Sequence, residues 1–579
     1  MTIPLSGSKK SNLKIPADYA DDGCSVVFSG IKKIRTACIV TIPVFLPAAC
    51  RLLCLLNRIK QFMSASLNNV QFLSVLSHIK VNFRQYYNSF SQNLPAKDKH
   101  LDIIIKLLIC AAMAGIIAAD IMYLEHLGEV REELMEISYG QAFMIFALAF
   151  LFISILELLW RSYLVWKYRP MSPCPQNELL SCSIVVPAFN EGRQVYMTLK
   201  SLAASNYPSE KFQIIAVDDG SSDDTWDWIC KAKQELGRKV TALKLPCNKG
   251  KRHALYAGFQ QSRGEVLVTV DSDSEVKPET LQNLISPMVI NSRIGAVAGN
   301  IRVLNHDKGI IPRMLDVLFV FSFDFIRASQ SMVNMVMCTP GALAAYRKTA
   351  VMPILQEWLN QTFFGRPSNI GEDRAITNLV IREGYDVFYQ QNAVAYTNVP
   401  TGYTGLCKMF LRWARSHIRE TIVMSRFAFR KFRFDSVFGL RVNLILHWFG
   451  IVLSPFFLFA TIACLYWRPL GFGLCVMVGI ILTSTVTGIV YTKRCGNSDA
   501  LLSYLYGLFV FISLSWISTY SLATMHHSGW LTRNNTVKKQ TSATILHKFY
   551  FDFDAFDSGK DFQMHRSSRQ ISETGKIAA

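Results

Sequence analysis

Four long apolar stretches constrain this chain more than any other feature of its sequence. They cover residues 103–123, 142–165, 442–467 and 470–491. A helix of about 20 apolar residues crosses the hydrocarbon core of a bilayer, so each stretch is long enough to be a membrane span. Hydrophobic residues make up 50% of the 579 residues. We therefore expect a multi-pass membrane protein.

The charges beside these stretches predict their orientation. The loop between the first two stretches contains Glu129, Glu132, Glu133 and Glu136 against the single Arg131, and Lys167 and Arg169 follow the second. Because cytosolic loops collect Lys and Arg, we expect the chain from Lys167 onward to be cytosolic. Residues 501–525 are also apolar, but a crossing there places the basic stretch 533–539 outside. We favour a re-entrant or interfacial segment for 501–525 over a further crossing.

The chain is basic, with 61 Lys and Arg against 42 Asp and Glu. Many basic proteins bind nucleic acid. Here, however, the positive charge is concentrated beside apolar stretches, at 1–100 and 408–441. That placement favours anionic lipid headgroups, and we expect no nucleic acid. Residues 1–33 lack the apolar centre of a cleavable signal peptide. The 14 cysteines form no C-x-x-C pair, which favours free thiols.

A polar region between the second and third stretches alternates strands and helices. Residues 183–189, 212–220, 239–246 and 264–273 are predicted strands, and the segments between them have helical length and spacing. Apolar strands alternating with helices predict a parallel sheet covered on both faces. A nucleotide-binding α/β domain is the usual fold for this pattern.

Four polar motifs follow in order within this domain. They are Asp218-Asp219-Gly220-Ser221, Asn248-Lys249-Gly250-Lys251-Arg252, Asp271-Ser272-Asp273 and Gly371-Glu372-Asp373-Arg374. Cations before a helix favour phosphate, and paired carboxylates after a buried strand can hold a divalent cation against a diphosphate. Each motif alone could be an ordinary turn, a solvated loop or a helix N-cap. Together, at strand ends, they predict one functional site.

The stretches VVPAFNEG, VDDGSSDDT, NKGKRHAL, VTVDSDS, FFGRPSNIGEDRAIT and LRWARSHIRET carry a resemblance to a known family. Over residues 180–425 the chain resembles the family-2 glycosyltransferases. Within that family it is most similar to the processive membrane branch of hyaluronan synthases and nodulation-type chitin-oligosaccharide synthases. The resemblance implies a GT-A-like α/β domain, embedded between transmembrane and interfacial helices, that uses a nucleotide-diphospho-sugar.

The resemblance also implies roles for individual residues. Asp373, beside Glu372, would be the general base that takes the proton of the acceptor hydroxyl. Asp271 and Asp273 would bracket Mg²⁺ or Mn²⁺. The remaining implied positions contact substrate: Pro187, Asp219 at the uridine, Lys251 or Arg252 near the diphosphate, Gly341 in the acceptor-contacting segment that begins at Cys338, Arg412 at the leaving diphosphate, and Trp413 stacking on the acceptor sugar.

Two departures from the family pattern stand out. The family has Gln-x-x-Arg-Trp, whereas Met409 occupies the first position here, and a thioether cannot replace the hydrogen bonds of an amide. Hyaluronan synthases have a Trp-Gly-Thr-Arg motif after the apolar segments, which the chain matches as Trp530-Leu531-Thr532-Arg533. We expect Trp530, Thr532 and Arg533 to bind substrate; a juxtamembrane anchor is the alternative.

We therefore expect an inverting, metal-dependent enzyme of the plasma membrane that polymerises a β-linked polysaccharide from a UDP-sugar, with UDP-GlcNAc favoured. A non-processive polyprenyl-phosphate glycosyltransferase, a glucan or uronan synthase and a non-catalytic membrane subunit are the alternatives. The expected domains are a basic region at 1–100, two spans within 101–169, a catalytic domain at 180–418, an interfacial helix at 419–441, two spans and a re-entrant or third apolar segment within 442–525, and a cytosolic tail at 526–579.

Overall fold

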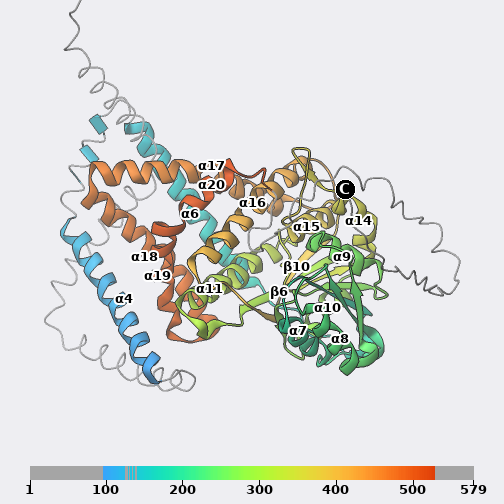
Figure 1. Ribbon diagram of the computed structural model, residues 1–579. Helices are drawn as coiled ribbons and strands as arrows, with labels where there is room; N and C mark the ends of the chain where they lie inside the picture. The colour runs from blue at the N-terminus through green and yellow to red at the C-terminus, as the bar shows by residue number, and fades with distance from the viewer. Residues whose placement is uncertain (1–95, 124–127, 129–130, 133–134, 137–139, 528–579) are drawn as a thin grey trace, which may run out of the picture. The chain divides into compact units, whose positions relative to one another are not determined.

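A mixed eight-stranded sheet forms the core of the polar part of the chain (Figure 1). The computed structural model describes residues 96–123, 128, 131–132, 135–136 and 140–527. The predictions for residues 1–95 and for Trp530, Thr532 and Arg533 lie outside the described residues. In spatial order the strands are β3 (Val240–Lys244), β2 (Phe212–Asp218), β1 (Cys182–Ala188), β4 (Val266–Thr269), β7 (Ala344–Arg347), β6 (Ile294–Val303), β10 (Asp386–Thr397) and β5 (Ser274–Val276).

The first four strands along the chain pair as predicted, and the second half of the sheet does not. β1 pairs in parallel with β2 and β4, and β2 pairs in parallel with β3. β7 runs antiparallel between β4 and β6, and β5 runs antiparallel beside β10. The prediction of a parallel sheet was therefore wrong for β5 and β7. It rested on the helix that links each pair of early strands, which is the connection that parallel neighbours need.

Helices cover both faces of the sheet, as predicted. Figure 1 shows α7, α8 and α10 on one face and α9, α14 and α15 on the other. Their bounds are α7 (Arg193–Ala203), α8 (Thr225–Leu236), α9 (Lys251–Gln260), α10 (Thr280–Ile290), α14 (Leu355–Leu359) and α15 (Glu372–Arg382). The strands β1, β2, β4 and β6 are buried almost throughout, which explains their nearly continuous apolar sequence. A two-stranded ribbon, β8 (Thr362–Phe363) and β9 (Arg366–Pro367), precedes α15.

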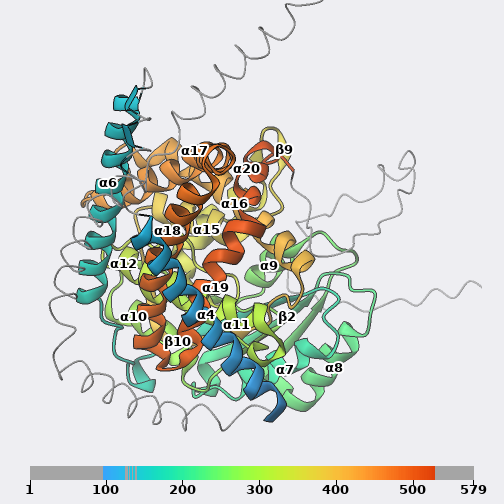
Figure 2. The ribbon, with the colours of Figure 1, turned by 90° about the vertical axis from the view of Figure 1, so that its left-hand side faces the viewer.

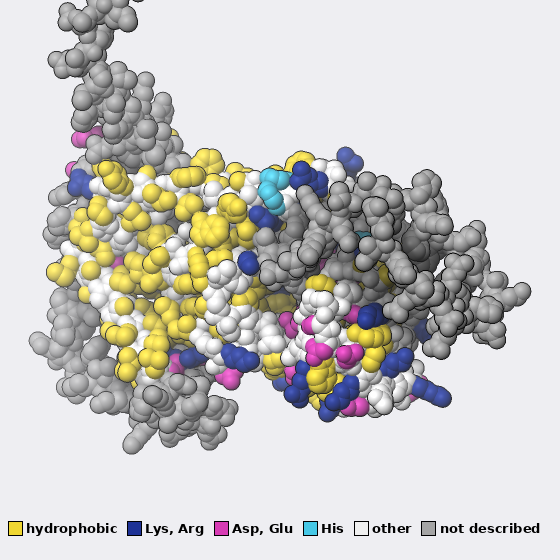
Figure 3. All heavy atoms as spheres, in the orientation of Figure 1, with side chains coloured by type: hydrophobic (Ala, Val, Ile, Leu, Met, Phe, Trp, Pro, Cys, Tyr) yellow, Lys and Arg dark blue, Asp and Glu magenta, His cyan; other side chains and the backbone are white. Residues whose placement is uncertain are grey.

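Each of the four predicted spans coincides with a helix that is long and apolar enough to cross a membrane. These helices are α4 (Ala96–Met122), α6 (Gly140–Lys167), α17 (Phe438–Trp467) and α18 (Pro469–Cys495). They leave large apolar side chains uncovered, among them Leu108, Phe152, Trp166 and Phe459, each at least 60% exposed. Figure 3 shows the apolar surface gathered on their side of the protein and the charged surface on the sheet domain. Such a surface suits lipid.

The last apolar stretch is bent. Residues 498–514 and 516–523 meet at an angle of 44°, so this pair is either a broken span or a re-entrant loop. It consists of η7 (Ser498–Leu501), α19 (Leu502–Phe509), the π-helical η8 (Val510–Leu514) and α20 (Trp516–Ala523). Figure 2 shows α4 lying beside α18 and α19, and α4 contacts both helices.

Residues 419–441 do not form the single interfacial helix that was predicted. They contain the end of α16 (Tyr403–Ala428), a loop at 429–437 and the start of α17. The Nη2 atom of Arg433, in the loop, lies 2.6 Å from Asp386 Oδ1 at the start of β10. This tertiary contact holds the loop against the sheet domain, and no pattern within 419–441 predicts a contact with Asp386.

Candidate active site

A cavity of about 410 Å³ opens beyond the end of β4. Its lining comes from segments far apart in sequence: Lys251 of α9, Asp271 and Asp273 after β4, residues 338 and 340–342 before β7, residues 371–374 at the start of α15, residues 397–399 at the end of β10, part of α16, and parts of α11 (Ile310–Phe321) and the π-helical η5 (Ser322–Arg327). Ligands of open α/β sheets bind outside the carboxyl ends of the strands. Residues of three of the four predicted motifs therefore line one cavity.

Lys251 joins two of the predicted motifs within the cavity. Its Nζ contacts Asp271 Oδ1 and lies 3.1 Å from Glu372 Oε1. Burial lowers the pKa of Lys251, but the two carboxylates outweigh burial, so the net pKa is raised and the ammonium stays charged. Gly341 leaves room for this side chain, because a Cβ at Gly341 would lie 2.5 Å from Lys251 Nζ. Three motifs of the sequence thus converge on one cation.

Asp271 and Asp273 follow the strand β4. The strand β4 ends at Thr269, and β5 begins at Ser274, so the two carboxylates lie in the tight connection between the strands. Asp273 Oδ1 accepts a hydrogen bond of 3.2 Å from Thr397 Oγ1. Both aspartates line the cavity.

Glu372 and Asp373 begin α15, where helix N–H groups stabilise negative charge. Burial, followed by the negative charge of Glu372, raises the pKa of Asp373. Burial also acts on Glu372, but Lys251 and Arg412 outweigh it and lower the pKa of Glu372. The Asp373 carboxylate accepts from the backbone N–H of Arg374 at 2.8 Å, and the Cys338 thiol lies 3.7 Å from Asp373 Oδ2. Asp373 is therefore the carboxylate whose environment favours accepting a proton.

The helix α16 supplies the opposite wall. Met409, Arg412 and Trp413 line the cavity from this helix. The Trp413 side chain is 38% exposed, and its ring centroid lies 5.6 Å from that of Phe410 and 6.1 Å from that of Phe319 on α11. Met409 is buried. A partly exposed indole beside two aromatic rings is a surface on which a sugar ring can stack.

Comparison with known proteins identifies the family. Residues 183–355 match the family model described as glycosyl transferase family 2. A hyaluronan synthase of Streptococcus pyogenes is 30% identical over 392 residues, which cover 64% of this chain and 88% of the relative. The chain belongs to glycosyltransferase family 2.

Two other similarities were found for this glycosyltransferase. An N-acetylglucosaminyltransferase of Azorhizobium caulinodans is 34% identical over 244 residues, which cover 42% of this chain and 61% of that relative. The solved mannosyltransferase PcManGT from Pyrobaculum calidifontis, in complex with GDP-Man and Mn²⁺, is 18% identical. It covers 62% of this chain and 95% of its own, with a TM-score of 0.44.

The glycosyltransferase cavity offers two carboxylates for a divalent cation. No group of three or more His, Cys, Asp and Glu side chains at metal-ligand positions was found among the described residues. Mg²⁺ in enzymes of phosphate-containing substrates is commonly held by one or two carboxylates together with phosphate oxygens. Asp271 and Asp273 fit that ligand set, in which the substrate supplies the remaining ligands.

Three predicted substrate-binding residues lie in other surroundings. Arg252 is 3% exposed and donates to Trp358 O at 2.6 Å and Gln361 Oε1 at 3.1 Å, so it points into the protein while Lys251 points into the cavity. Asp219 accepts from the backbone N–H groups of Lys249 and Gly250, and burial raises its pKa. Pro187 is buried in β1 opposite Val217. The lining of the cavity includes none of the three.

Several cavity residues carry no sequence signal. Phe319, Phe323 and Arg327 come from α11 and η5, a segment whose apolar pattern resembles an ordinary buried helix. The guanidinium carbon of Arg327 lies 3.9 Å from the centre of the Phe323 ring. Only the three-dimensional packing of this segment against α16 brings these residues to the site. Arg374, which also lines the cavity, could have been found, because it follows the predicted base directly.

Proposed function

We propose that this glycosyltransferase polymerises a β-linked polysaccharide from a UDP-sugar, with UDP-GlcNAc favoured, and passes the product through its own membrane helices. One observation carries the proposal. A single cavity contains the carboxylates Asp271 and Asp273, the partly buried carboxylate Asp373 and the stacking surface of Trp413. Two walls of that cavity, α11 and α16, contact the candidate membrane helices α18 and α17 respectively.

The proposed reaction is a direct displacement at the anomeric carbon. The acceptor sugar stacks on Trp413. Its hydroxyl attacks the anomeric carbon while the bond from this carbon to the β-phosphate oxygen of UDP breaks. Asp373 takes the hydroxyl proton, which its raised pKa favours. Attack from the side opposite the leaving group converts an α-linked donor into a β-glycoside.

The leaving diphosphate requires positive charge on the other side of the anomeric carbon. Lys251 and Arg412 supply it from the cavity wall. Mg²⁺ or Mn²⁺ held by Asp271 and Asp273 would neutralise further phosphate charge as a Lewis acid. Glu372 keeps Lys251 in place through the ion pair of 3.1 Å. We propose no role in direct contact with the diphosphate for Arg252, because its guanidinium is buried away from the cavity.

We propose that the catalytic domain lies in the cytosol and that residues 498–523 are re-entrant. Both ends of this bent pair contact the sheet domain or α16. Near its start, Asp499 pairs with Arg313 of α11. After its end, Arg419 of α16 donates to Met525 O at 2.7 Å and to His527 O at 2.5 Å. This arrangement supports a cytosolic tail, and we place the multi-pass protein in the plasma membrane as part of the same proposal.

The proposed function is tested with purified full-length protein in lipid nanodiscs. We expect release of UDP from radiolabelled UDP-GlcNAc, alone or together with UDP-GlcA, in the presence of Mg²⁺ or Mn²⁺. The product is sized by gel filtration. A polymer supports the proposal, whereas a lipid-extractable product with one sugar would identify a polyprenyl-phosphate glycosyltransferase. Absence of UDP release from any nucleotide sugar would contradict both functions.

A further inference from the structure

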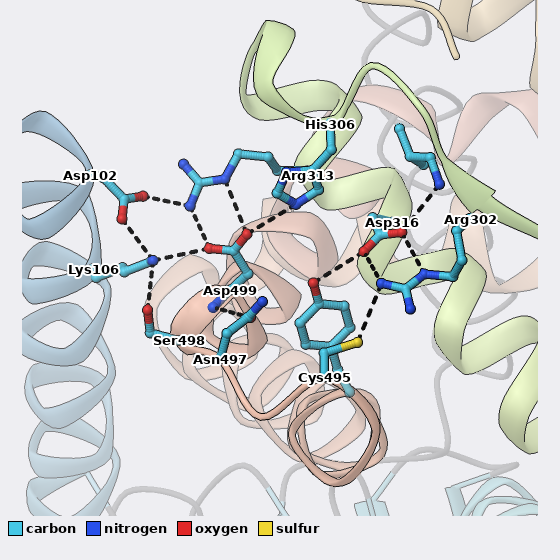
Figure 4. A network of polar contacts seen from close by, with 12 residues as sticks. Asp102, Lys106, Arg302, His306, Arg313, Asp316, Cys495, Asn497, Ser498 and Asp499 are labelled. Atoms are coloured by element: carbon cyan, nitrogen blue, oxygen red, sulfur yellow. Dashed lines mark hydrogen bonds and ion pairs between the residues drawn. The ribbon is translucent and has the colours of Figure 1, made fainter. Parts of the chain in front are cut away.

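A buried cluster of charged side chains connects the first membrane helix with the catalytic domain (Figure 4). Lys106 Nζ of α4 lies 2.7 Å from Asp102 Oδ2 and 3.0 Å from Asp499 Oδ1. Arg313 of α11 pairs with both of these carboxylates, at 2.6 Å from Asp102 Oδ1. We name Asp102, Lys106, Arg313 and Asp499 the anchor cluster.

The anchor cluster is balanced in charge and largely buried. It contains two carboxylates and two cations, and Asp102, Lys106 and Asp499 are each at most 7% exposed. Its polar neighbours add contacts: Ser498 Oγ accepts from Lys106 at 2.8 Å, and His306 Nε2 lies 3.2 Å from Asp499 Oδ2. Charges buried this deeply are tolerated when they are paired and hydrogen-bonded. Such a group has a defined geometry and resists displacement.

A second polar group holds the next turn of α11. The guanidinium of Arg302, on β6, donates to Asp316 through two hydrogen bonds of 2.9 and 2.7 Å. Tyr491 of α18 donates to the same carboxylate at 3.1 Å. Arg313 and Asp316 are three residues apart and therefore face the same side of the helix. Both groups fix α11 against the membrane helices from that side.

The helix α11 is also a wall of the cavity. Leu318 and Phe319, one to two turns beyond Arg313, line the cavity, and the Phe319 ring lies 6.1 Å from the Trp413 ring. The π-helical η5 continues α11 directly and adds Ser322, Phe323 and Arg327 to the lining. π-helical turns are frequent at functional sites. A rotation or slide of α11 therefore changes the surface on which an acceptor sugar stacks.

We propose that the anchor cluster consists of positioning residues for acceptor binding: it fixes α11 against α4 and so keeps Phe319 beside Trp413. This inference rests on the proposed function, because elongation requires an acceptor sugar in that part of the cavity. The donor carboxylates Asp271 and Asp273 lie on other elements. Weakening the cluster therefore acts on the acceptor and leaves the donor site intact.

The decisive variant is the double substitution Arg313→Gln with Asp499→Asn. It removes one charge of each sign, so Asp102 and Lys106 remain a neutral pair while the contacts that fix α11 are lost. We expect the KM for a short β-linked GlcNAc oligosaccharide to rise about 10-fold and the chains to be shorter, since small misplacements weaken positioning strongly. The KM for UDP-GlcNAc is expected to stay within about 2-fold of the unsubstituted protein, because the donor residues are not displaced.

Two further variants keep the test decisive. Asp307→Asn removes an exposed carboxylate next to His306 and serves as the matched control, with unchanged acceptor KM expected. Arg313→Lys keeps the charge and loses the forked geometry, so an intermediate acceptor KM is expected, and it replaces the double variant if that variant does not fold. A folded variant with unchanged acceptor KM and chain length would overturn the inference. If the unsubstituted protein makes no polymer, the proposed function fails, and the acceptor KM for a single transfer still decides the inference.

Discussion

Glu372 and Asp373 are adjacent carboxylates with opposite protonation behaviour. Glu372 pairs with Lys251, and its pKa is lowered. Asp373 lacks such a direct ion pair among the contacts of the described residues, and burial and Glu372 raise its pKa. Two titratable groups whose surroundings drive their pKa values apart commonly divide acid–base and electrostatic roles. Glu372 therefore stabilises the cation, and Asp373 is the proposed base.

The rate of sugar transfer is predicted to fall as the pH is lowered. This fall is expected at a higher pH than for an enzyme whose catalytic aspartate has an ordinary pKa. The raised pKa of Asp373 means that the base is protonated, and inactive, earlier as the pH drops. Arg374 lowers this pKa, so Arg374→Gln is expected to move the acid limb to higher pH by about 1 unit. The shift of the acid limb is measured from the profile of kcat/KM against pH. Arg382→Gln, at the far end of α15, is the control, and an unmoved limb in Arg374→Gln would contradict the assignment.

Gly371 is predicted to be intolerant of a side chain. Its φ of +77° is in the left-handed region, and a Cβ there would lie 1.9 Å from Ser416 Oγ of α16. Gly371→Ala therefore forces α15 and α16 apart, on top of a backbone cost of about 1–2 kcal/mol. We expect at least about 10² lower kcat/KM, because both helices carry site residues.

A second substitution separates the effect of the contact with Ser416 from the effect of the strained backbone at residue 371. Ser416→Gly combined with Gly371→Ala removes the contact but keeps the strained backbone, so partial recovery of kcat/KM is expected. Ser416→Gly alone controls for the loss of the hydroxyl. Full activity in Gly371→Ala would show that this close approach of α15 and α16 is not required.

At the scale of elements, Glu420 links α15 to α16. Its carboxylate accepts from Asn378 Nδ2 of α15 at 2.8 Å and from Gln361 Nε2 at 3.0 Å. Burial raises the pKa of Glu420 to about 7, although Arg252 and these hydrogen bonds act in the opposite direction. Arg252 is buried and does not line the cavity, so we propose that it has a structural role near Glu420.

The raised pKa of Glu420 predicts a pH dependence of stability. Between an unfolded pKa of about 4.5 and the folded value of about 7, the unfolded chain loses its proton first. Folding stability from this group therefore decreases as the pH rises through that window. Glu420→Gln, which cannot ionise, is expected to show a smaller drop in Tm between pH 5 and pH 8, by several degrees. Glu383→Gln, on the surface after α15, is the control; equal drops in all three proteins would contradict the effect.

The sequence predicted elements with strong local signals and missed those that depend on tertiary contacts. Apolar spans and the strands before Asp219 and Asp271 were recognisable because their patterns are local. The sequence gives no sign that Arg252 turns inward while Lys251 turns to the cavity, since the two residues are adjacent cations. The direction of β7 and the loop at 429–437 depend on pairing partners far along the chain. Cavity residues on α11 were missed for the same reason.

At the scale of the whole molecule, the contacts of the catalytic domain gather at one end of the candidate membrane helices. The anchor cluster ties the start of α4 to the catalytic domain, and Arg415 and Arg419 tie the chain after α20 to α16. The turn at Arg468 lies between α17 and α18, at the opposite end of both helices from these contacts. The turn at Arg468 is therefore expected on the side of the membrane away from the catalytic domain.

Labelling with a membrane-impermeant maleimide tests this topology. In a cysteine-depleted background in intact cells, a cysteine at Arg468 is expected to be labelled, while cysteines at Asn497 and His526 are labelled only after lysis. The control is a cysteine at Lys231, on the surface of α8. Labelling at His526 in intact cells would show that residues 498–523 cross the membrane and would contradict the re-entrant proposal.

The most direct test of the central claim compares donor binding with turnover in Asp373→Asn and Asp273→Asn. If Asp373 is the base, Asp373→Asn binds UDP-GlcNAc as the unsubstituted protein does and loses about 10²–10⁴ in the rate of UDP release. If Asp271 and Asp273 hold the donor through a divalent cation, Asp273→Asn loses donor binding, and excess Mg²⁺ or Mn²⁺ does not restore the original affinity. Isothermal titration calorimetry measures donor binding, and a UDP-release assay measures turnover. Asp373→Asn elongating chains at the original rate would contradict the account.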